Sequence, residues 1–246
     1  MIYSILIALI LMGEITMSEF YDLENESIAY NSRMADPNEL FSDEFVEEMK
    51  FYEGTTEYQK EVGIFKDGVF KSYEDTEGHQ TIGFGHNIKS GESDLFFKGL
   101  SIEEADSLLK VDLKDALINV HKRHQVETDE VQEVLVDLYF QHGAHTMTTQ
   151  FSEFVTAMND LDYERAAANL MYIDPDLPEG KRKFSEYYEK YPDRAVNNIN
   201  KLLNTRKEVH QYMLENNIID TMLDLDENPL EIKNRQNYIN IINLGL

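Results

Sequence analysis

Apolar side chains recur every three or four positions over much of the chain, which is the spacing of one face of an α-helix. The clearest example begins at Ser101, which forms a capping-box pattern with Glu104, and the periodic run continues to about His121. Ser42 and Gly54 are residue types that begin and end helices, and they flank another periodic run. We therefore expect helices at 43–53, 101–121, 129–141, 150–160, 162–173, 181–190 and 192–214.

A different pattern occupies the region between the first two of these helices. Over 63–73, the pair Asp67-Gly68 lies between short apolar runs, which is a strong signal for a two-residue β-hairpin turn. A third strand is expected at 79–84. Residues 63–86 are therefore predicted to form a small antiparallel sheet, and the chain is predicted to have an α+β fold.

Composition agrees with a folded protein and narrows the chemistry. The 246 residues are 42% hydrophobic and 28% charged, which is enough apolar material for a packed core. Cysteine is absent, which excludes disulfides, thiolate nucleophiles and cysteine-ligated zinc. The net charge of −25 argues against nucleic acid as a partner, because binding phosphates requires a basic face.

The acidic charge is unevenly distributed. Residues 14–50 carry eleven acidic and two basic side chains, a net charge of −9. Residues 51–214 carry −12 and residues 215–246 carry −4. Two interpretations stay open: a surface that keeps the protein soluble, and an adaptation to high salt, where screening weakens the repulsion between like charges.

The N-terminal part has its own pattern. Residues 2–12 are apolar apart from Ser4, a run too short to span a bilayer as a helix. Three interpretations remain: an export signal, a membrane anchor, and a start site placed too early, with translation beginning at Met17. Membrane contact is expected only under the first two. The acidic stretch 18–40 is expected to be a leader or linker.

Three polar residues lie where the predicted helix, hairpin and third strand meet. Glu53 ends the helix, Asp75 follows the hairpin, and Thr81 lies six residues later. Hydrolysis of a glycosidic bond requires one carboxyl that protonates the leaving oxygen and a second that activates water or attacks the sugar. An Asp close to a Gly is also ordinary turn chemistry, so spacing alone does not assign this function.

The motif around these residues is more specific. Asp75-Thr-Glu-Gly-His-Gln-Thr-Ile-Gly-Phe-Gly-His86 resembles the Asp-x-x-Gly-x-x-Thr-Ile-Gly-x-Gly-His signature of phage-type lysozymes. The ending Phe-Tyr-Glu53-Gly resembles the end of that family's first helix. Three further segments are similar to family motifs in the same order along the chain: Phe-Gln-His-Gly at 140–143, Ala-Ala-Ala-Asn-Leu at 166–170 and Asp-Arg-Ala at 193–195.

This resemblance covers roughly residues 43–205 and implies an architecture. It implies a two-lobed lysozyme-like fold, with a small antiparallel sheet lobe and a larger helical lobe joined by the helix 101–121. The organisation expected from it is an apolar segment and acidic leader at 1–40, a catalytic domain at 41–205 and a C-terminal extension at 206–246. We expect a monomer.

The resemblance also implies a function and roles for individual residues. The substrate would be the β-1,4 linkage between N-acetylmuramic acid and N-acetylglucosamine in bacterial peptidoglycan. Glu53 would be the general acid, while Asp75 and Thr81 would position the attacking water, with inversion at the anomeric carbon and carboxyls about 6.5–9.5 Å apart. No cofactor or metal is implied. The resemblance further implies sugar contacts by Phe140, Gln141, Asn169 and Gly85, an arginine near the acid at Arg194, and a structural histidine at His86.

One feature departs from the family pattern. The family places eight residues between its Glu and Asp, whereas 21 separate Glu53 from Asp75. We interpret the surplus as a hairpin insertion near 55–72. The alternative acid is Asp67, which has seven residues before Asp75. We favour Glu53, because it ends a helix and because the hairpin turn already explains Asp67.

Other functions compete with this interpretation. A lytic transglycosylase needs the acid but no water-activating base, and Asp75 and Thr81 argue against it. A non-catalytic peptidoglycan-binding or virion structural protein could use the same scaffold, although the retained Glu, Asp and Thr argue against loss of activity. Both routes to the wall stay open, lysis of the host cell from within and transport on the phage particle. The histidine pairs His121/His124 and His142/His145 have helical spacing but no recognised set of metal ligands.

Overall fold

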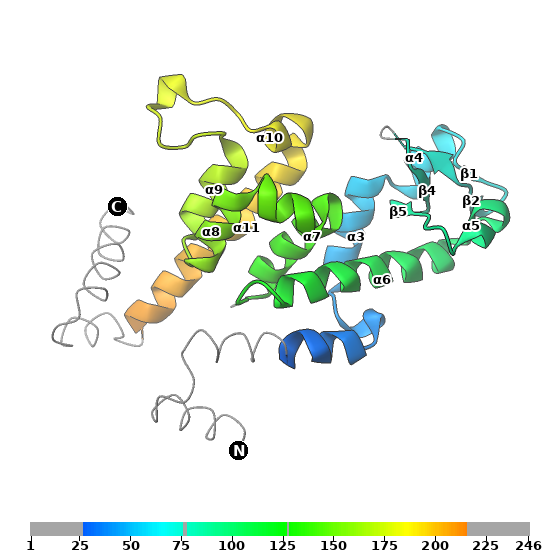
Figure 1. Cartoon of the computed structure of the whole chain (residues 1–246), viewed down its shortest axis with the longest axis horizontal. Coiled ribbons are helices and arrows are strands. Elements are labelled where there is room, and N and C mark those ends of the chain that lie inside the picture. The colour runs from blue at the N-terminus through cyan, green and yellow to red at the C-terminus, as the bar shows by residue number, and fades with distance from the viewer. Residues whose placement is uncertain (1–26, 76–77, 127, 216–246) are drawn as a thin grey trace, which may run out of the picture. The chain divides into compact units, whose positions relative to one another are not determined.

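The computed structural model describes residues 27–75, 78–126 and 128–215 (Figure 1). Contacts along the chain group it into two compact units, Met1–Asp160 and Leu161–Leu246. The apolar run at 2–12, the possible start at Met17 and most of the C-terminal extension lie outside the described residues.

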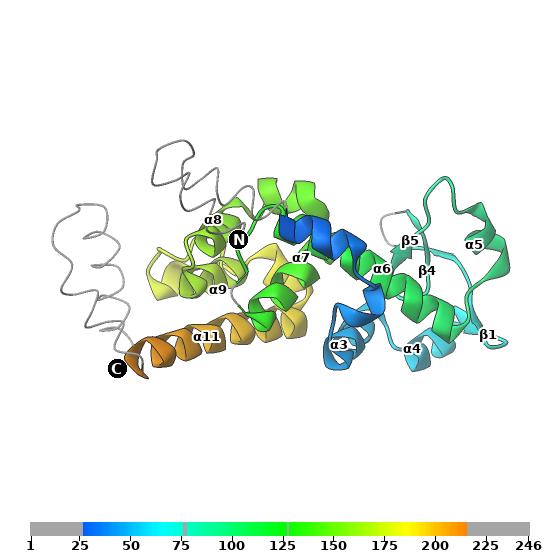
Figure 2. The same ribbon diagram turned by 90° about the horizontal axis from the view of Figure 1, so that it is seen from below.

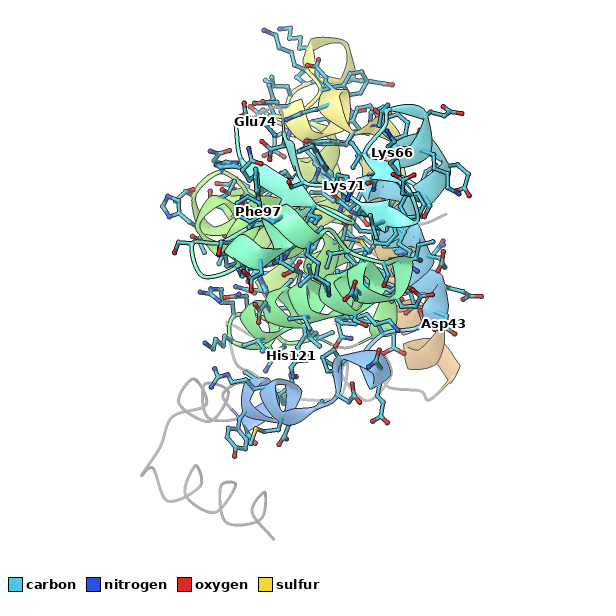
Figure 3. The ribbon with its side chains drawn as sticks, turned by 90° about the vertical axis from the view of Figure 1, so that its right-hand side faces the viewer. Asp43, Lys66, Lys71, Glu74, Phe97 and His121 are labelled. Atoms are coloured by element: carbon cyan, nitrogen blue, oxygen red, sulfur yellow. The ribbon has the colours of Figure 1, made fainter. Side chains whose placement is uncertain are left out.

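The first unit begins with a segment for which the sequence predicts a leader or linker. Residues 27–34 are helical, and a 3₁₀ turn, η1 (Pro37–Glu39), follows. Ser32 is buried, and its Oγ lies 2.8 Å from Nδ1 of His121, which Figure 3 labels beside this segment. Lys114 Nζ donates a 2.7 Å hydrogen bond to the carbonyl of Ala35. The linker expectation is therefore wrong for residues 27–39, because they dock on the helix that contains His121 and Lys114.

The first predicted helix is confirmed as α3 (Asp43–Glu53). The Ser42 side chain accepts a hydrogen bond from the backbone N–H of Phe45, which satisfies one of the unpaired donors at the helix start. Phe45, Val46 and Met49 are buried along one face. The helix stops at Gly54, and a short second helix that the apolar pattern did not predict follows at once, α4 (Thr56–Glu61).

The predicted hairpin is confirmed, but the single sheet over 63–86 is not. β1 (Phe65–Lys66) pairs with β2 (Val69–Phe70) as an isolated two-stranded sheet. A separate three-stranded sheet has the order β3 (Tyr73–Glu74), β4 (Gln80–Ile82), β5 (His86–Asn87). The strands are only two or three residues long, and both sheets are antiparallel.

The tight turn between β1 and β2 forms for the reason expected. Lys66 pairs with Val69, so Asp67 and Gly68 are the two loop residues, with φ of 56° and 81°. A two-residue hairpin turn with positive φ at both positions matches the twist of the strands, and Asp-Gly tolerates that backbone best. Phe70 at the end of β2 is fully buried and bridges to Leu100.

A long helix runs from the sheets to the helical part of the first unit (Figure 2). α5 (Ser93–Lys98), which the sequence pattern did not predict, precedes it. α6 (Ile102–His121) begins with the predicted capping box between Ser101 and Glu104. The helix contacts α7 (Asp129–Thr149), and its buried face consists of Ala105, Leu109, Leu113, Ala116, Leu117 and Val120.

α7 is longer than the predicted 129–141 because two helical segments meet at Gly143. Gly143 has φ 70° and ψ 161°, which interrupts the helix directly after the Phe-Gln-His sequence. The first part contributes Val131, Val134, Leu135 and Leu138 to the core. α8 (Ser152–Asn159) follows and agrees with the helix predicted at 150–160.

The second unit is built on two helices that pack along each other. α9 (Tyr163–Met171) contacts α11 (Pro192–Glu215), and Ala166, Leu170, Ala195 and Leu202 are fully buried. Both helices agree with the sequence-based expectation.

The helix predicted at 181–190 is wrong for half its length. Only a 3₁₀ turn, η2 (Glu179–Lys181), and a short helix, α10 (Glu186–Lys190), form there. Between them, Phe184 makes an antiparallel bridge to Tyr172. Backbone pairing with the end of α9 therefore overrides the helical spacing of the apolar residues.

The α+β class is confirmed, since helices dominate and the short strands are antiparallel. Within residues 27–75, 78–126 and 128–215, no helix combines the length and the apolar character that a membrane crossing needs.

Candidate active site

The Glu53 carboxylate lies against the backbone of Gly85. Glu53 is the last residue of α3 and is half-buried, and its Oε2 is 2.7 Å from where a Cβ would stand on Gly85. Gly85 has φ of +83°, a conformation that side-chain-bearing residues rarely adopt. Both the positive φ and the contact with Glu53 therefore favour glycine at position 85, and the absence of a side chain lets the β4–β5 turn lie next to Glu53.

A buried glutamine links the end of α3 to the same turn. Gln59 on α4 is 2% exposed, and its Nε2 donates hydrogen bonds of 3.0 Å to the carbonyls of Gly54 and Gly83. Gly54 directly follows Glu53, and Gly83 is two residues before Gly85. Sequence reasoning missed Gln59, because no motif marks it and α4 belongs to the predicted insertion.

Asp75, at the start of the β3–β4 connection, lies beside Thr81 on β4. Thr81 is buried on β4, and its Oγ1 is 3.4 Å from Oδ2 of Asp75. The other carboxylate oxygen, Oδ1, accepts a 2.8 Å hydrogen bond from the backbone N–H of His79. Asp75 stays partly open to solvent, with 31% of its side chain exposed. The aspartate is thus held by its neighbours and remains accessible.

Tyr73 connects the two carboxylates electrostatically. It lies on β3 two residues before Asp75 and is partly buried. Burial raises the pKa of the Tyr73 hydroxyl, and the negative charges of Glu53 and then Asp75 raise it further. Both predicted catalytic carboxylates therefore act on one side chain, which sequence reasoning missed because a tyrosine in a strand is usually structural.

The alternative acid, Asp67, occupies a different environment. It is exposed at the tip of the β1–β2 hairpin with a positive φ of 56°. The hairpin turn accounts for both its position and its residue type.

His86 is a buried, doubly bonded histidine. It is 4% exposed on β5, with Nδ1 2.7 Å from Asp112 Oδ2 and Nε2 3.1 Å from Glu92 Oε2. Burial lowers the pKa of His86, but the hydrogen bonds and charges of Asp112 and Glu92 outweigh it, so the pKa lies above its usual value. The contact with Asp112 ties the sheet to α6.

The predicted sugar-contacting residues of the first unit lie on α7. Phe140 and Gln141 are half-buried and precede the break at Gly143. Gln141 Oε1 is buried, and none of the described residues donates a hydrogen bond to it. A buried polar atom without a partner is costly, so it is a position where a ligand could supply the missing bond.

Two predicted residues belong to the second unit. Asn169 is half-buried on α9, and its Nδ2 has no acceptor among the described residues. Arg194 is 4% exposed near the start of α11.

Two other histidines are held by neutral partners. His121 Nε2 lies 3.1 Å from Gln132 Oε1. His124 is 2% exposed, with Nδ1 2.7 Å from Asn159 Oδ1 and Nε2 2.9 Å from the Tyr139 hydroxyl. Burial lowers the pKa of His124 to about 4.

Comparison with known proteins agrees with the motifs. The phage lysozyme family model matches residues 66–182, a range that includes Asp75 and Thr81 and begins after Glu53. Solved structures similar to this chain include the endolysin of Escherichia coli O157:H7 phage FAHEc1, with 21% identity and a TM-score of 0.45 over 67% of this chain and 93% of that chain.

A second similar structure is the muramidase domain of SpmX from Asticaccaulis excentricus, with 19% identity and a TM-score of 0.46 over 66% of this chain and 96% of that chain. A search of curated proteins finds no match. The family match shows that the chain contains a phage lysozyme domain over residues 66–182, a glycoside hydrolase domain whose general activity is hydrolysis of peptidoglycan.

Proposed function

We propose that the protein hydrolyses the β-1,4 linkage between N-acetylmuramic acid and N-acetylglucosamine with inversion, using Glu53, Asp75 and Thr81. The observation that carries this proposal is the arrangement around the β4–β5 turn. The Glu53 carboxylate lies against Gly85 in the β4–β5 turn, and Asp75, just after β3, lies beside Thr81 in the middle of β4. Both carboxylates act on Tyr73.

In this proposal, Glu53 protonates the leaving glycosidic oxygen. A general acid must be held within hydrogen-bond reach of the oxygen that leaves. Glu53 is half-buried at the end of α3, and its carboxylate lies against Gly85, which has no side chain that would block the glycan. Gly85 would thus leave room for both the Glu53 carboxylate and the bound sugar.

Asp75 would be the base that orients and deprotonates the attacking water. The His79 N–H donates to one carboxylate oxygen, which stabilises the ionised form. Thr81 Oγ1 is near the other oxygen and could hold the same water. Inversion requires space for that water between the carboxyls, about 6.5–9.5 Å.

The remaining predicted site residues would bind the glycan or support the catalytic residues. Phe140, Gln141 and Asn169 would contact sugar, and the unpartnered amide atoms of Gln141 and Asn169, seen among the described residues, favour this role. Arg194, which is buried near the start of α11, would have a supporting role, and His86 would hold the sheet to α6 through Asp112. We propose a monomer whose catalytic domain spans 41–205, with an insertion that consists of α4 and the β1–β2 hairpin.

The test compares Glu53→Gln with Asp67→Asn on one suspension of purified peptidoglycan. Glu53→Gln keeps the shape of the side chain but has no proton to give, and loss of general acid catalysis costs about 10² to 10⁴-fold in rate. Asp67→Asn keeps a residue that suits a turn before Gly68, so wall lysis should stay near wild type. A dead Asp67→Asn beside an active Glu53→Gln would reverse the assignment.

The products identify the reaction. Reducing muramic acid ends of α configuration, seen by NMR immediately after cleavage, are expected from an inverting muramidase. Anhydro ends would indicate a lytic transglycosylase, and β ends would indicate retention; either outcome would contradict the proposed role of Asp75.

A further inference from the structure

The second unit carries an ordered set of aromatic rings between α9 and α10. Tyr172, Phe184 and Tyr188 are arranged so that neighbouring rings are nearly parallel, and we call these three residues the aromatic stack. The Tyr172 and Phe184 centroids are 5.6 Å apart with planes at 13°, and the Phe184 and Tyr188 centroids are 4.7 Å apart with planes at 20°. Arg182 lies over the Tyr172 ring, with its Cζ 5.4 Å from the centroid.

Backbone pairing fixes this arrangement. Tyr172 and Phe184 face each other across an antiparallel bridge, with Ile173 donating to the Lys183 carbonyl at 3.0 Å and Ser185 to the Met171 carbonyl at 2.9 Å. Figure 1 shows the α9–α10 connection, in yellow, as an extended loop. Rings held in this way lose little further conformational entropy when a ligand binds.

The stack remains open to solvent. Phe184 is 45% exposed although it lies between two rings, and the neighbouring Ile173 is 71% exposed. Ring centroids 4.7 and 5.6 Å apart exceed the contact distance between carbon atoms, about 3.5–4.0 Å, so the rings are offset and part of each face is uncovered. Uncovered apolar area of this kind commonly marks a binding surface.

Three consecutive basic residues adjoin the stack. Lys181, Arg182 and Lys183 form the longest run of Lys and Arg in a chain of net charge −25, and all three are exposed. The same stretch, 172–190, also contains five exposed acidic residues, Asp174, Asp176, Glu179, Glu186 and Glu189, so the excess of positive charge is confined to the run itself. Of these acids, Asp176 is paired with Arg165, which lowers the pKa of Asp176 through hydrogen bonding. A local basic run in an acidic protein favours a ligand that carries carboxylates.

We propose that the aromatic stack and the adjacent run Lys181–Lys183 form a glycan-binding site made of residues other than those proposed above for catalysis and sugar contact. The C–H faces of pyranose rings would lie on the uncovered parts of Phe184 and Tyr188, and the basic side chains would bind carboxylates of the lactyl and peptide groups. Peptidoglycan carries both features. The proposal rests on the proposed function only for the identity of this glycan.

The stack fits a glycan better than it fits a membrane surface. Interfacial membrane binding uses aromatic side chains that project separately into the lipid headgroups. Here the rings are packed on one another and tied to a backbone bridge, which favours a flat ligand that lies across them.

The test is cosedimentation of the full chain with purified peptidoglycan on ice, at low and moderate salt. Phe184→Ala should weaken binding by about tenfold, as expected for truncation of an aromatic contact near the centre of a site. Lys183→Glu should weaken binding most at low salt. The matched control is Phe97→Ala, which removes an exposed aromatic on α5 (79% exposed; labelled in Figure 3) and should leave binding unchanged.

Each outcome decides the proposal. Equal binding by Phe184→Ala and wild type, with both proteins folded by circular dichroism, would overturn it, and so would wild-type binding to anionic lipid vesicles but not to peptidoglycan. Binding is measured without turnover, so an inactive protein that still shows the Phe184 effect contradicts only the proposed catalytic function.

A buried glutamine carries a second inference, which rests on Glu53 being the acid. From its two 3.0 Å hydrogen bonds, we infer that Gln59 is a positioning residue that sets the distance between the end of α3 and the β4–β5 turn. Glu53 is adjacent to one bonded carbonyl, that of Gly54, and its carboxylate rests on Gly85 near the other. Loss of the amide donor would remove the hydrogen bonds that both carbonyls accept from Gln59, and leaving a buried carbonyl without a donor is costly.

Gln59→Leu should lower kcat by about 10 to 100-fold with KM little changed, because misplacement of a catalytic group by about 1 Å has effects of this size. The pH–rate profile should also shift on the limb that reports the acid. Tyr139→Phe is the matched control, since it removes a buried hydrogen bond to His124 in the same unit and should leave kcat and the profile unchanged.

Gln59→Asn, which keeps the amide but shortens its reach, covers the case in which Gln59→Leu does not fold. An activity loss no larger than the loss of folded protein, with an unshifted profile, would overturn the inference. If Glu53→Gln is itself active, the failure lies in the proposed acid and not in Gln59.

Discussion

Substitution of Gly85 by alanine tests the placement of the proposed acid most directly. An alanine at φ +83° costs roughly 1–2 kcal/mol of backbone strain. Its Cβ would also stand 2.7 Å from Glu53 Oε2, closer than a real Cβ and an oxygen approach. Because strain alone leaves the site intact, the contact with Glu53 is what should affect catalysis.

Gly63→Ala is the matched control for strain. Gly63 has φ of +80° but no atom within 4 Å of its added Cβ, so the backbone cost is shared and the steric contact is absent. Each variant should lower the melting temperature by a few degrees, since about 1 kcal/mol corresponds to roughly 2–4 °C for a chain of this size.

The two variants should separate in activity. Gly85→Ala should lower the initial rate of wall lysis by about 10²-fold, the effect of moving a catalytic group by roughly 1 Å, while Gly63→Ala should stay within a factor of about two. Turbidity decrease on purified walls, normalised to the folded fraction, measures both. If the two variants lose stability alike and retain activity alike, the Glu53–Gly85 contact has no catalytic role.

Three further predictions concern pH and salt. The pKa of His124 is lowered to about 4, so the neutral histidine contributes stability that is fully present above pH 6.5. This contribution, up to about 3 kcal/mol, is lost as pH falls towards 4. Urea unfolding should show the loss in wild type and not in His124→Gln, and the same pH dependence in both proteins would refute the prediction. The pKa of His86 is raised, so its contribution is present below about pH 6.5 and lost as pH rises through the folded-state value; Asp112→Asn should therefore be less stable than wild type at pH 5.5 and closer to it at pH 9, and a constant difference would contradict this. If the acidic surface serves high-salt conditions, wall lysis should persist or rise well above physiological salt, whereas an optimum at low ionic strength would count against that interpretation.

Local signals in the sequence were enough to predict most helices and the hairpin. Ser42 and the Ser101–Glu104 capping box start helices through bonds to their own neighbours, and the Asp67-Gly68 turn is set by two adjacent residues. Such features depend on chain only a few residues away, so spacing and residue type predict them. The motif from Asp75 to His86 is contiguous as well, so the sequence alone indicates the family.

Other features depended on contacts between distant segments. The helical spacing over 181–190 was overridden because residues near Phe184 pair with Tyr172, twelve positions earlier. The stretch 27–39 has the polar composition of a linker, yet Ser32 and the carbonyl of Ala35 find hydrogen-bonding partners on α6.

The candidate site shows the same division. The sequence by itself named Glu53, Asp75 and Thr81, since family motifs are short and contiguous. Only the tertiary structure brought Glu53 against Gly85, which is 32 positions away in the sequence. It also paired Gln59 with the carbonyls of Gly54 and Gly83. The negative charges of Glu53 and Asp75 both raise the pKa of Tyr73, which likewise depends on the folded arrangement. The physical reason is that α4 and the β1–β2 hairpin lengthen the chain between the proposed acid and the proposed base, whereas the position of Glu53 in space is set by the packing of α3, α4 and the β4–β5 turn.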